Sequence, residues 1–153
     1  MTKQPEINIA TAHKYFSAYC FNAAWGLIEK KDRTPEDDNE MIRLCQASIW
    51  HWTQREDCTD KNLSIGYWQA SRIFALLGRD FPARKYGQLS LENAKEAEPF
   101  FIAYAYEALA GAESVAGDTA KRDEYLAEAR KLTEQVSDAE SKKMLEADLA
   151  TIG

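Results

Sequence analysis

Two histidines, His13 and His51, are the residues of this chain best suited to metal or acid–base chemistry. A catalytic zinc or iron site usually takes three protein ligands, so the two histidines present would need a carboxylate beside them. Nothing in the sequence indicates that the two residues meet. Because a single helical histidine more often packs through a hydrogen bond than binds an ion, we predict no metal ligand and no cofactor. A metal-dependent enzyme that uses His13 and His51 stays open as an alternative.

The other reactive groups also favour structural roles. The acidic run 36–40 lacks the turn glycine and distal glutamate of a calcium loop, and acids suit the positive start of a helix. Cys20, Cys45 and Cys58 make an odd count without C-x-x-C spacing, which does not indicate a disulfide framework. No P-loop, dinucleotide-binding turn, H-E-x-x-H or nucleophile elbow is present. No nucleophile, base and orienting group can be assembled from spacing, so we predict that the chain is not an enzyme.

Composition limits the class of protein and its partners. The length of 153 residues suits one domain, residues 1–153, and 45% hydrophobic with 29% charged residues is typical of a folded chain. A net charge of −6 argues against nucleic acid, which requires a concentrated basic surface. Neither a membrane-length apolar run nor a signal-peptide core is present. We therefore expect a cytoplasmic protein with no membrane partner.

Helical periodicity dominates the chain, and patterns typical of strands are nearly absent. Apolar residues recur every three to four positions, as on one face of a helix. In the first segment two such stripes lie beside each other, one through Phe16 and Tyr19 and one through Phe21 and Trp25. The pattern predicts an all-α fold of seven helices, carried by residues 12–28, 34–52, 63–77, 80–94, 99–115, 118–136 and 137–149.

Helix boundaries are marked by local signals. Thr34-Pro35 has a capping threonine followed by a proline in the first turn, and the basic cluster 30–33 suits the preceding helix end. Gly78 and Gly117 suit the left-handed conformation that follows many helices. Ser137-x-x-Glu140 predicts a capping box for the last helix.

The segment around Gly78 resembles a tetratricopeptide repeat, and Gly117 repeats its turn at a spacing near the family's roughly 34-residue period. With Gly78 as the turn glycine, the family's aromatic, small and apolar positions fall on Tyr67, Ser71, Phe74, Ala83, Tyr86 and Leu91. Gly87 departs from the pattern because an aromatic residue is usual there. The repeat around Gly117 matches less well, since Glu113 and Arg122 stand where an aromatic and an alanine are expected.

A second resemblance covers the amino-terminal part of the chain. Trp25-x-Leu27-x-Glu29-Lys30, the string 33–37 and His51-Trp52 are similar to small bacterial helical-repeat proteins of uncharacterised function. This resemblance implies a fold and no activity. Together the two resemblances imply a right-handed helical repeat, tetratricopeptide-like, with about three helix pairs and a closing C-terminal helix.

In such a repeat the first helix of each pair lines a concave groove. Carrying the repeat over residue by residue places Trp68, Arg72, Tyr104 and Glu107 in the groove. A looser analogy adds Phe16 and Tyr19 from the first helix pair. Arg72 could clamp a carboxylate, or it could pair with Glu107 and hold helices together. Consecutive residues of a helix point about 100° apart, so Trp50 and Trp52, two positions apart, cannot share a face. We therefore expect one to pack inside and the other to be partly exposed.

These observations predict a non-catalytic interaction module, a scaffold or adaptor that holds a protein or peptide in its groove. One alternative is a small-molecule sensor with an aromatic pocket near Trp68, Arg72 and Tyr104. The chain could also form a homo-oligomer through its apolar end faces.

Overall fold

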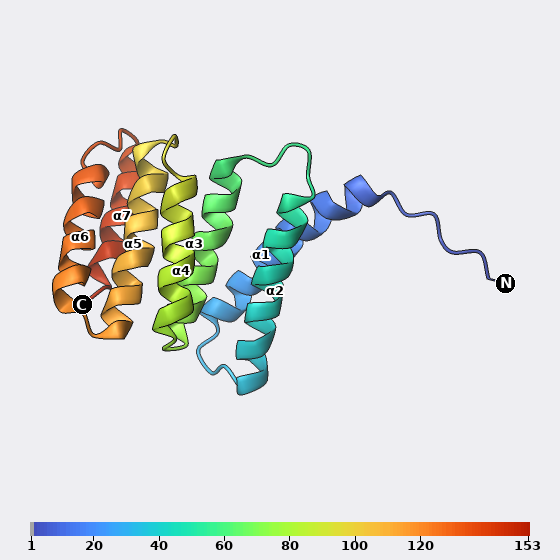
Figure 1. Ribbon diagram of the computed structural model, residues 1–153, viewed down its shortest axis with the longest axis horizontal. Helices are drawn as coiled ribbons and strands as arrows, with labels where there is room; N and C mark the ends of the chain where they lie inside the picture. Colours follow the sequence, from blue (N-terminus) through green and yellow to red (C-terminus); the bar gives the residue numbers. More distant parts are fainter. Residues whose placement is uncertain (1) are drawn as a thin grey trace. The chain divides into compact units, whose positions relative to one another are not determined.

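The computed structural model describes residues 2–153, and over these residues it contains helices and no strand (Figure 1). The all-α prediction is therefore confirmed. The helices are α1 (Ile9–Glu29), α2 (Pro35–Thr53), α3 (Asp60–Leu76), α4 (Asp80–Asn93), α5 (Pro99–Ala116), α6 (Thr119–Thr133) and α7 (Ala139–Ala150).

The helices belong to two compact units, unit 1 (Met1–Cys58) and unit 2 (Thr59–Gly153). Unit 1 is the packed pair α1 and α2. In unit 2 the pairs α3–α4 and α5–α6 pack together through α5, which contacts both α3 and α4. The helices are thus arranged as packed pairs, and the expectation of one domain over residues 1–153 remains a prediction.

Side-chain caps begin five of the helices among residues 2–153, at Asn8, Thr34, Thr59, Asp118 and Asp138. Thr34 and Asp37 form a reciprocal capping box at the start of α2. Arg33 donates to the last carbonyls of α1, those of Ile28 and Lys30, at 3.2 and 3.1 Å, which confirms a structural role for this part of the basic cluster. The predicted capping box at Ser137 is wrong, because Asp138 accepts from the Ser141 amide at 2.9 Å and caps α7 instead.

Both predicted turn glycines have positive φ, 72° at Gly78 and 79° at Gly117. After α3 the Arg79 amide donates to the Phe74 carbonyl at 2.8 Å, and after α5 the Asp118 amide donates to the Glu113 carbonyl at 3.1 Å. These six-to-one bonds satisfy carbonyls that the helix end leaves unpaired. The same type of turn therefore joins both helix pairs of unit 2.

In unit 1 small buried residues let α1 and α2 approach closely. Ser17, Cys20 and Ala24 of α1 are buried, and α2 contributes Met41, Cys45, Ser48 and Ile49. The Ser48 hydroxyl donates to the Ser17 carbonyl at 2.7 Å, which pairs this polar group inside the contact. The pair therefore has a narrow core, and the rest of the surface of α1 is left outside it.

In unit 2 α5 is the central helix, and its alanines allow close packing. Five alanines of α5 are buried, Ala103, Ala105, Ala108, Ala110 and Ala112. A methyl group at Gly87 of α4 would lie 2.9 Å from the Leu109 side chain, which explains why glycine replaces the expected aromatic residue there. Close α4–α5 contact is thus built into the sequence.

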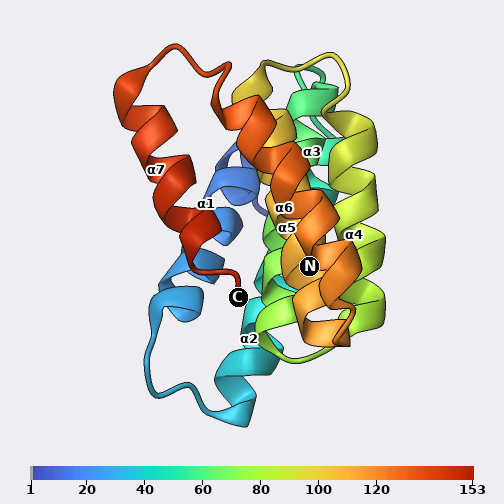
Figure 2. The same cartoon turned by 90° about the vertical axis from the view of Figure 1, so that its left-hand side faces the viewer.

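The last helix lies against the second pair of unit 2. The loop after α6 leads to α7, which runs alongside α5 and α6 (Figure 2). Leu145 and Leu149 of α7 are buried. No helix among residues 2–153 has the length and apolar character needed to cross a membrane.

Candidate functional site

A continuous cluster of six rings extends across α1 and α2. We call it the α1–α2 aromatic face, and it consists of His13, Tyr15, Phe16, Tyr19, Trp50 and His51. Tyr15 stacks on Tyr19 with 5.6 Å between ring centroids, and Phe16 contacts Tyr15 at 5.1 Å. Phe16 also reaches His51 of α2 at 5.5 Å. The cluster therefore extends without a break from one helix to the other.

Most of this face is exposed. Tyr15 is 59% exposed, Phe16 42%, Tyr19 52% and Trp50 55%. Among Asp, Glu, Lys and Arg, α1 carries only Lys14 and Glu29, so the face has few charges. Exposed rings in contact with each other form an apolar surface of the kind that binding partners cover.

Helix geometry explains how the sequence places these rings. Residue 19 lies about one helix turn after residues 15 and 16, so the three residues share a side of α1. Ser17 and Cys20 of α1 are buried, whereas Tyr15, Phe16 and Tyr19 are exposed. Trp50 is exposed while Trp52 is partly buried under Arg55, whose guanidinium carbon lies 3.8 Å from the ring centre. The prediction that the two tryptophans differ in exposure is confirmed.

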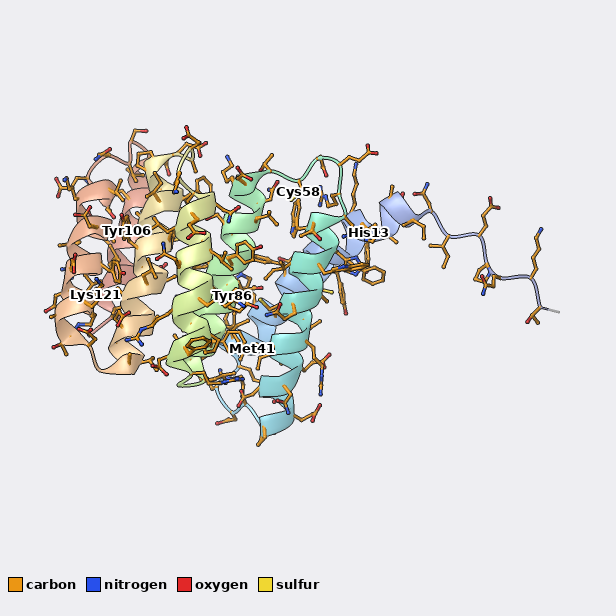
Figure 3. The ribbon with its side chains drawn as sticks, in the orientation of Figure 1. His13, Met41, Cys58, Tyr86, Tyr106 and Lys121 are labelled. Atoms are coloured by element: carbon orange, nitrogen blue, oxygen red, sulfur yellow. The ribbon has the colours of Figure 1, made fainter. Side chains whose placement is uncertain are left out.

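His13 and His51 meet inside this face. Their Nδ1 atoms are 2.9 Å apart and join α1 to α2 through a hydrogen bond. Figure 3 labels His13 where side chains of the two helices come together. Burial, and secondarily the charge of His13, lower the pKa of His51 below the usual value. At neutral pH His51 is therefore held in its uncharged form.

A cleft of about 410 Å³ adjoins His13. Glu56 and Asp57 both line this cleft, and Arg55 holds Asp57 by donating from Nε and Nη2 to its two carboxylate oxygens at 2.8 and 2.7 Å. This pairing lowers the pKa of Asp57 to about 2. Arg55 also donates to the Ser17 hydroxyl at 3.0 Å. Asp57 is thus committed to arginine. Residues 2–153 contain no group of three or more His, Cys, Asp or Glu suited to a metal ion.

The four predicted groove residues of unit 2 come together where α3 meets α5. The rings of Trp68 and Tyr104 are 5.3 Å apart and edge to face. Arg72 donates from Nη1 to Glu107 at 3.5 Å. Asp148 of α7 joins them because the Tyr104 hydroxyl donates to it at 2.7 Å. We call Trp68, Arg72, Tyr104, Glu107 and Asp148 the α3–α5–α7 cluster.

Glu107 is the buried member of this cluster, with 4% of its surface exposed. Burial, and to a smaller extent Asp148, raise its pKa against the opposing effects of Arg72 and Trp68, and the net value is about 7. Burial and the bond to Asp148 also raise the pKa of Tyr104. Glu107 is therefore near the midpoint of its titration at neutral pH.

Glu113 follows Glu107 by six positions on α5. Both of its carboxylate oxygens accept a hydrogen bond from an arginine, whereas Arg72 donates to one oxygen of Glu107. Arg84 of α4 donates from Nε and Nη2 to its two carboxylate oxygens, both at 2.8 Å. Two parallel bonds of this kind are the strongest arginine–carboxylate arrangement. Glu113, which the tetratricopeptide pattern reserves for an aromatic residue, thus connects the two helix pairs of unit 2.

Sequence reasoning identified part of these sites. Phe16 and Tyr19 lie on the α1–α2 aromatic face, and Trp68, Arg72, Tyr104 and Glu107 lie in the α3–α5–α7 cluster. Tyr15 and Trp50 were not among the predicted site residues, although the spacing of Tyr15 and Tyr19 indicates a shared side. Asp148 of α7, which bonds Tyr104, was not among the predicted site residues either.

Comparison of the chain with protein-family models, with curated proteins and with solved structures found no match.

Proposed function

We propose that this protein is a non-catalytic interaction module, and that a protein segment docks on the α1–α2 aromatic face. The observation that carries the proposal is the continuous, largely exposed set of rings from Tyr15 to Trp50. An aromatic side chain covers about 150–250 Å². About half of each of the four large rings is exposed, which leaves roughly 300–500 Å² to cover, as in the largest patches of typical monomers.

The chemistry of the face defines the partner. Tyr and Trp are frequent anchors of protein interfaces because they are large, rigid and amphipathic. The six residues of the face include no acidic side chain and no lysine or arginine. A partner therefore gains most by presenting apolar side chains, while its backbone can bond the tyrosine hydroxyls and the indole of Trp50.

The thiols and carboxylates support a non-catalytic role. Burial raises the pKa of Cys45 to about 12 and raises that of Cys20, so neither is a ready nucleophile. Asp57, which lines the cleft beside His13, is bound by Arg55 and so is not available to orient the imidazole. These features favour binding over acid–base or covalent catalysis.

The finer architecture is part of the same proposal. We infer a right-handed, tetratricopeptide-like repeat, supported by the repeated glycine turns and by the packing of α5 on both α3 and α4. A module of this class in the cytoplasm would act as a scaffold or adaptor.

The proposal is tested by affinity capture from the source cells with the wild type and three variants. Tyr15→Ala/Tyr19→Ala removes the stacked pair, Phe81→Ala removes an exposed ring of α4 (76% exposed), and Arg72→Ala opens the α3–α5–α7 cluster. We expect the double variant alone to lose a specific partner.

Retention of every partner by the double variant would contradict the proposal, and loss with Arg72→Ala alone would move the site to unit 2. If no partner is captured and a metabolite mixture raises the melting temperature, the sensor alternative replaces it. Light scattering on each variant identifies a second copy of the chain as the partner.

A further inference from the structure

The paired histidines of the α1–α2 aromatic face have a geometry that goes beyond a packing contact. Their Nδ1 atoms are 2.9 Å apart. Metal–imidazole bonds are about 2.0–2.1 Å long. Two such bonds at a right angle place the nitrogens about 2.9 Å apart, whereas a tetrahedral angle places them about 3.3 Å apart. The observed separation matches the right-angle arrangement.

We propose that His13 and His51 form a two-nitrogen site for a divalent transition-metal ion that prefers tetragonal coordination. Cu²⁺ should bind most tightly and Ni²⁺ next. Right-angle coordination by nitrogen and oxygen is typical of these two ions, and Cu²⁺ forms the tightest complexes of the first-row series. Water would fill the remaining positions. The proposal is independent of protein docking on the same face, and it departs from the sequence expectation that no residue binds metal.

The surroundings hold both imidazoles in place before any ion arrives. Trp50 lies 5.4 Å from the His13 ring and 4.9 Å from the His51 ring. Phe16 contacts His51 at 5.5 Å. Two rings fixed by packing lose little freedom on binding, which is the condition for a useful site with only two protein ligands.

Proton balance is simple in this arrangement. In the hydrogen-bonded pair one ring carries its proton on Nδ1 and donates it to the other. Binding requires that ring to carry its proton on Nε2 instead, so that both Nδ1 lone pairs face the ion. The ion-bound rings are both neutral, so any further proton held by the pair is released to solvent on binding.

The experiment uses full-length protein without a histidine tag. Cys58→Ser serves as the parent so that this thiol of intermediate exposure cannot bind or reduce copper. Cu²⁺ is titrated by calorimetry, and the bound ion is examined by electron paramagnetic resonance. His13→Gln and His51→Gln each remove one ligand, and Glu56→Gln changes a neighbouring carboxylate of the cleft as the matched control.

We expect one Cu²⁺ per chain with a tetragonal spectrum split by two imidazole nitrogens. Either histidine variant should bind at least about tenfold more weakly, and Glu56→Gln should bind like the parent. Equal binding by the parent and both histidine variants would overturn the proposal.

A second measurement does not depend on how the variants fold. The chain has two histidines, so its imidazole proton signals in nuclear magnetic resonance belong to this pair alone. Added Cu²⁺, which is paramagnetic, should broaden the signals of both rings together. Broadening of one ring only, or of neither at saturating Cu²⁺, would also overturn the site.

Discussion

Unit 1 and unit 2 both carry aromatic and polar residues on neighbouring helices, but the two units place them in different surroundings. On α1 and α2 the rings of Tyr15, Tyr19 and Trp50 lie half or more in solvent. In the α3–α5–α7 cluster, Tyr104 bonds Asp148 and Arg72 bonds Glu107. The polar groups of unit 2 are thus used within the unit, while the surface of unit 1 remains available to a partner.

Because of this difference, we expect mutations in the two regions to affect different properties, stability in unit 2 and binding in unit 1. Removing an enclosed side chain destabilises the fold by the burial that is lost, whereas removing an exposed one changes stability little and binding much. Each change below tests whether the two regions differ in this way.

The largest effect on stability is expected for a buried ring of unit 2. Phe74 is buried and stacks on Tyr86 at 5.7 Å, so Phe74→Ala should lower the free energy of unfolding by about 3–5 kcal/mol. Trp50→Ala on the α1–α2 aromatic face should lower it by less than about 1 kcal/mol. Urea denaturation followed by circular dichroism measures both, and similar losses would remove the distinction between the regions.

Glu113→Gln should have the next largest effect and lower the free energy of unfolding by about 1.5–3 kcal/mol. The substitution removes the charge that accepts two hydrogen bonds from Arg84. Asp80→Asn is the matched control, since Asp80 meets the same arginine at 3.4 Å in an exposed pair and should change stability by less than about 0.5 kcal/mol. Equal effects of the two substitutions would show that Arg84 does not join the helix pairs through Glu113.

Glu107→Gln should increase the stability of the protein at alkaline pH, whereas the two substitutions above decrease it. The pKa of Glu107 is about 7, against an ordinary value of 4.5. Between these values the folded chain keeps a proton that the unfolded chain has lost, so stability falls as pH rises through this range. Glutamine cannot titrate, and the variant should be about 1–3 kcal/mol more stable than wild type at pH 8. At pH 4 this advantage should vanish; an equal difference at both pH values would contradict the burial argument.

The smallest effect concerns His51 in unit 1. Its pKa is lowered from 6.5 by burial and by His13, so the unfolded chain takes up a proton first as pH falls. Stability should therefore decrease as pH falls below 6.5, and His51→Gln should remove this part of the pH dependence. Thermal melts of both proteins between pH 5 and 7.5 check it, and a persistent slope in the variant would assign the effect to another group.

The elements that were predictable from sequence are those specified by local chemistry. Gly78 and Gly117 mark turns because they relieve the backbone at positive φ, and Thr34 caps α2 through a bond three residues away. The Ser137 box failed because Asp138, one position on, offers a better acceptor to the same helix start.

The sites depended on packing between helices, which local patterns do not determine. His13 and His51 are 38 positions apart, and their meeting depends on how α1 lies against α2. The contact of Tyr104 with Asp148 depends likewise on how α7 lies against α5. Gly87 appeared to be a departure from the repeat until Leu109 was seen to occupy the space of its missing side chain.

The central claim is that a protein partner docks on the α1–α2 aromatic face, and position-specific photocrosslinking tests it most directly. Benzoylphenylalanine is introduced at Tyr19 or, as the matched control, at Phe81 of α4, and the cells are irradiated. We expect one defined crosslinked product from position 19, lost when Tyr15→Ala is added, and none from position 81. Equal products from both positions, or a product from position 81 alone, would contradict it.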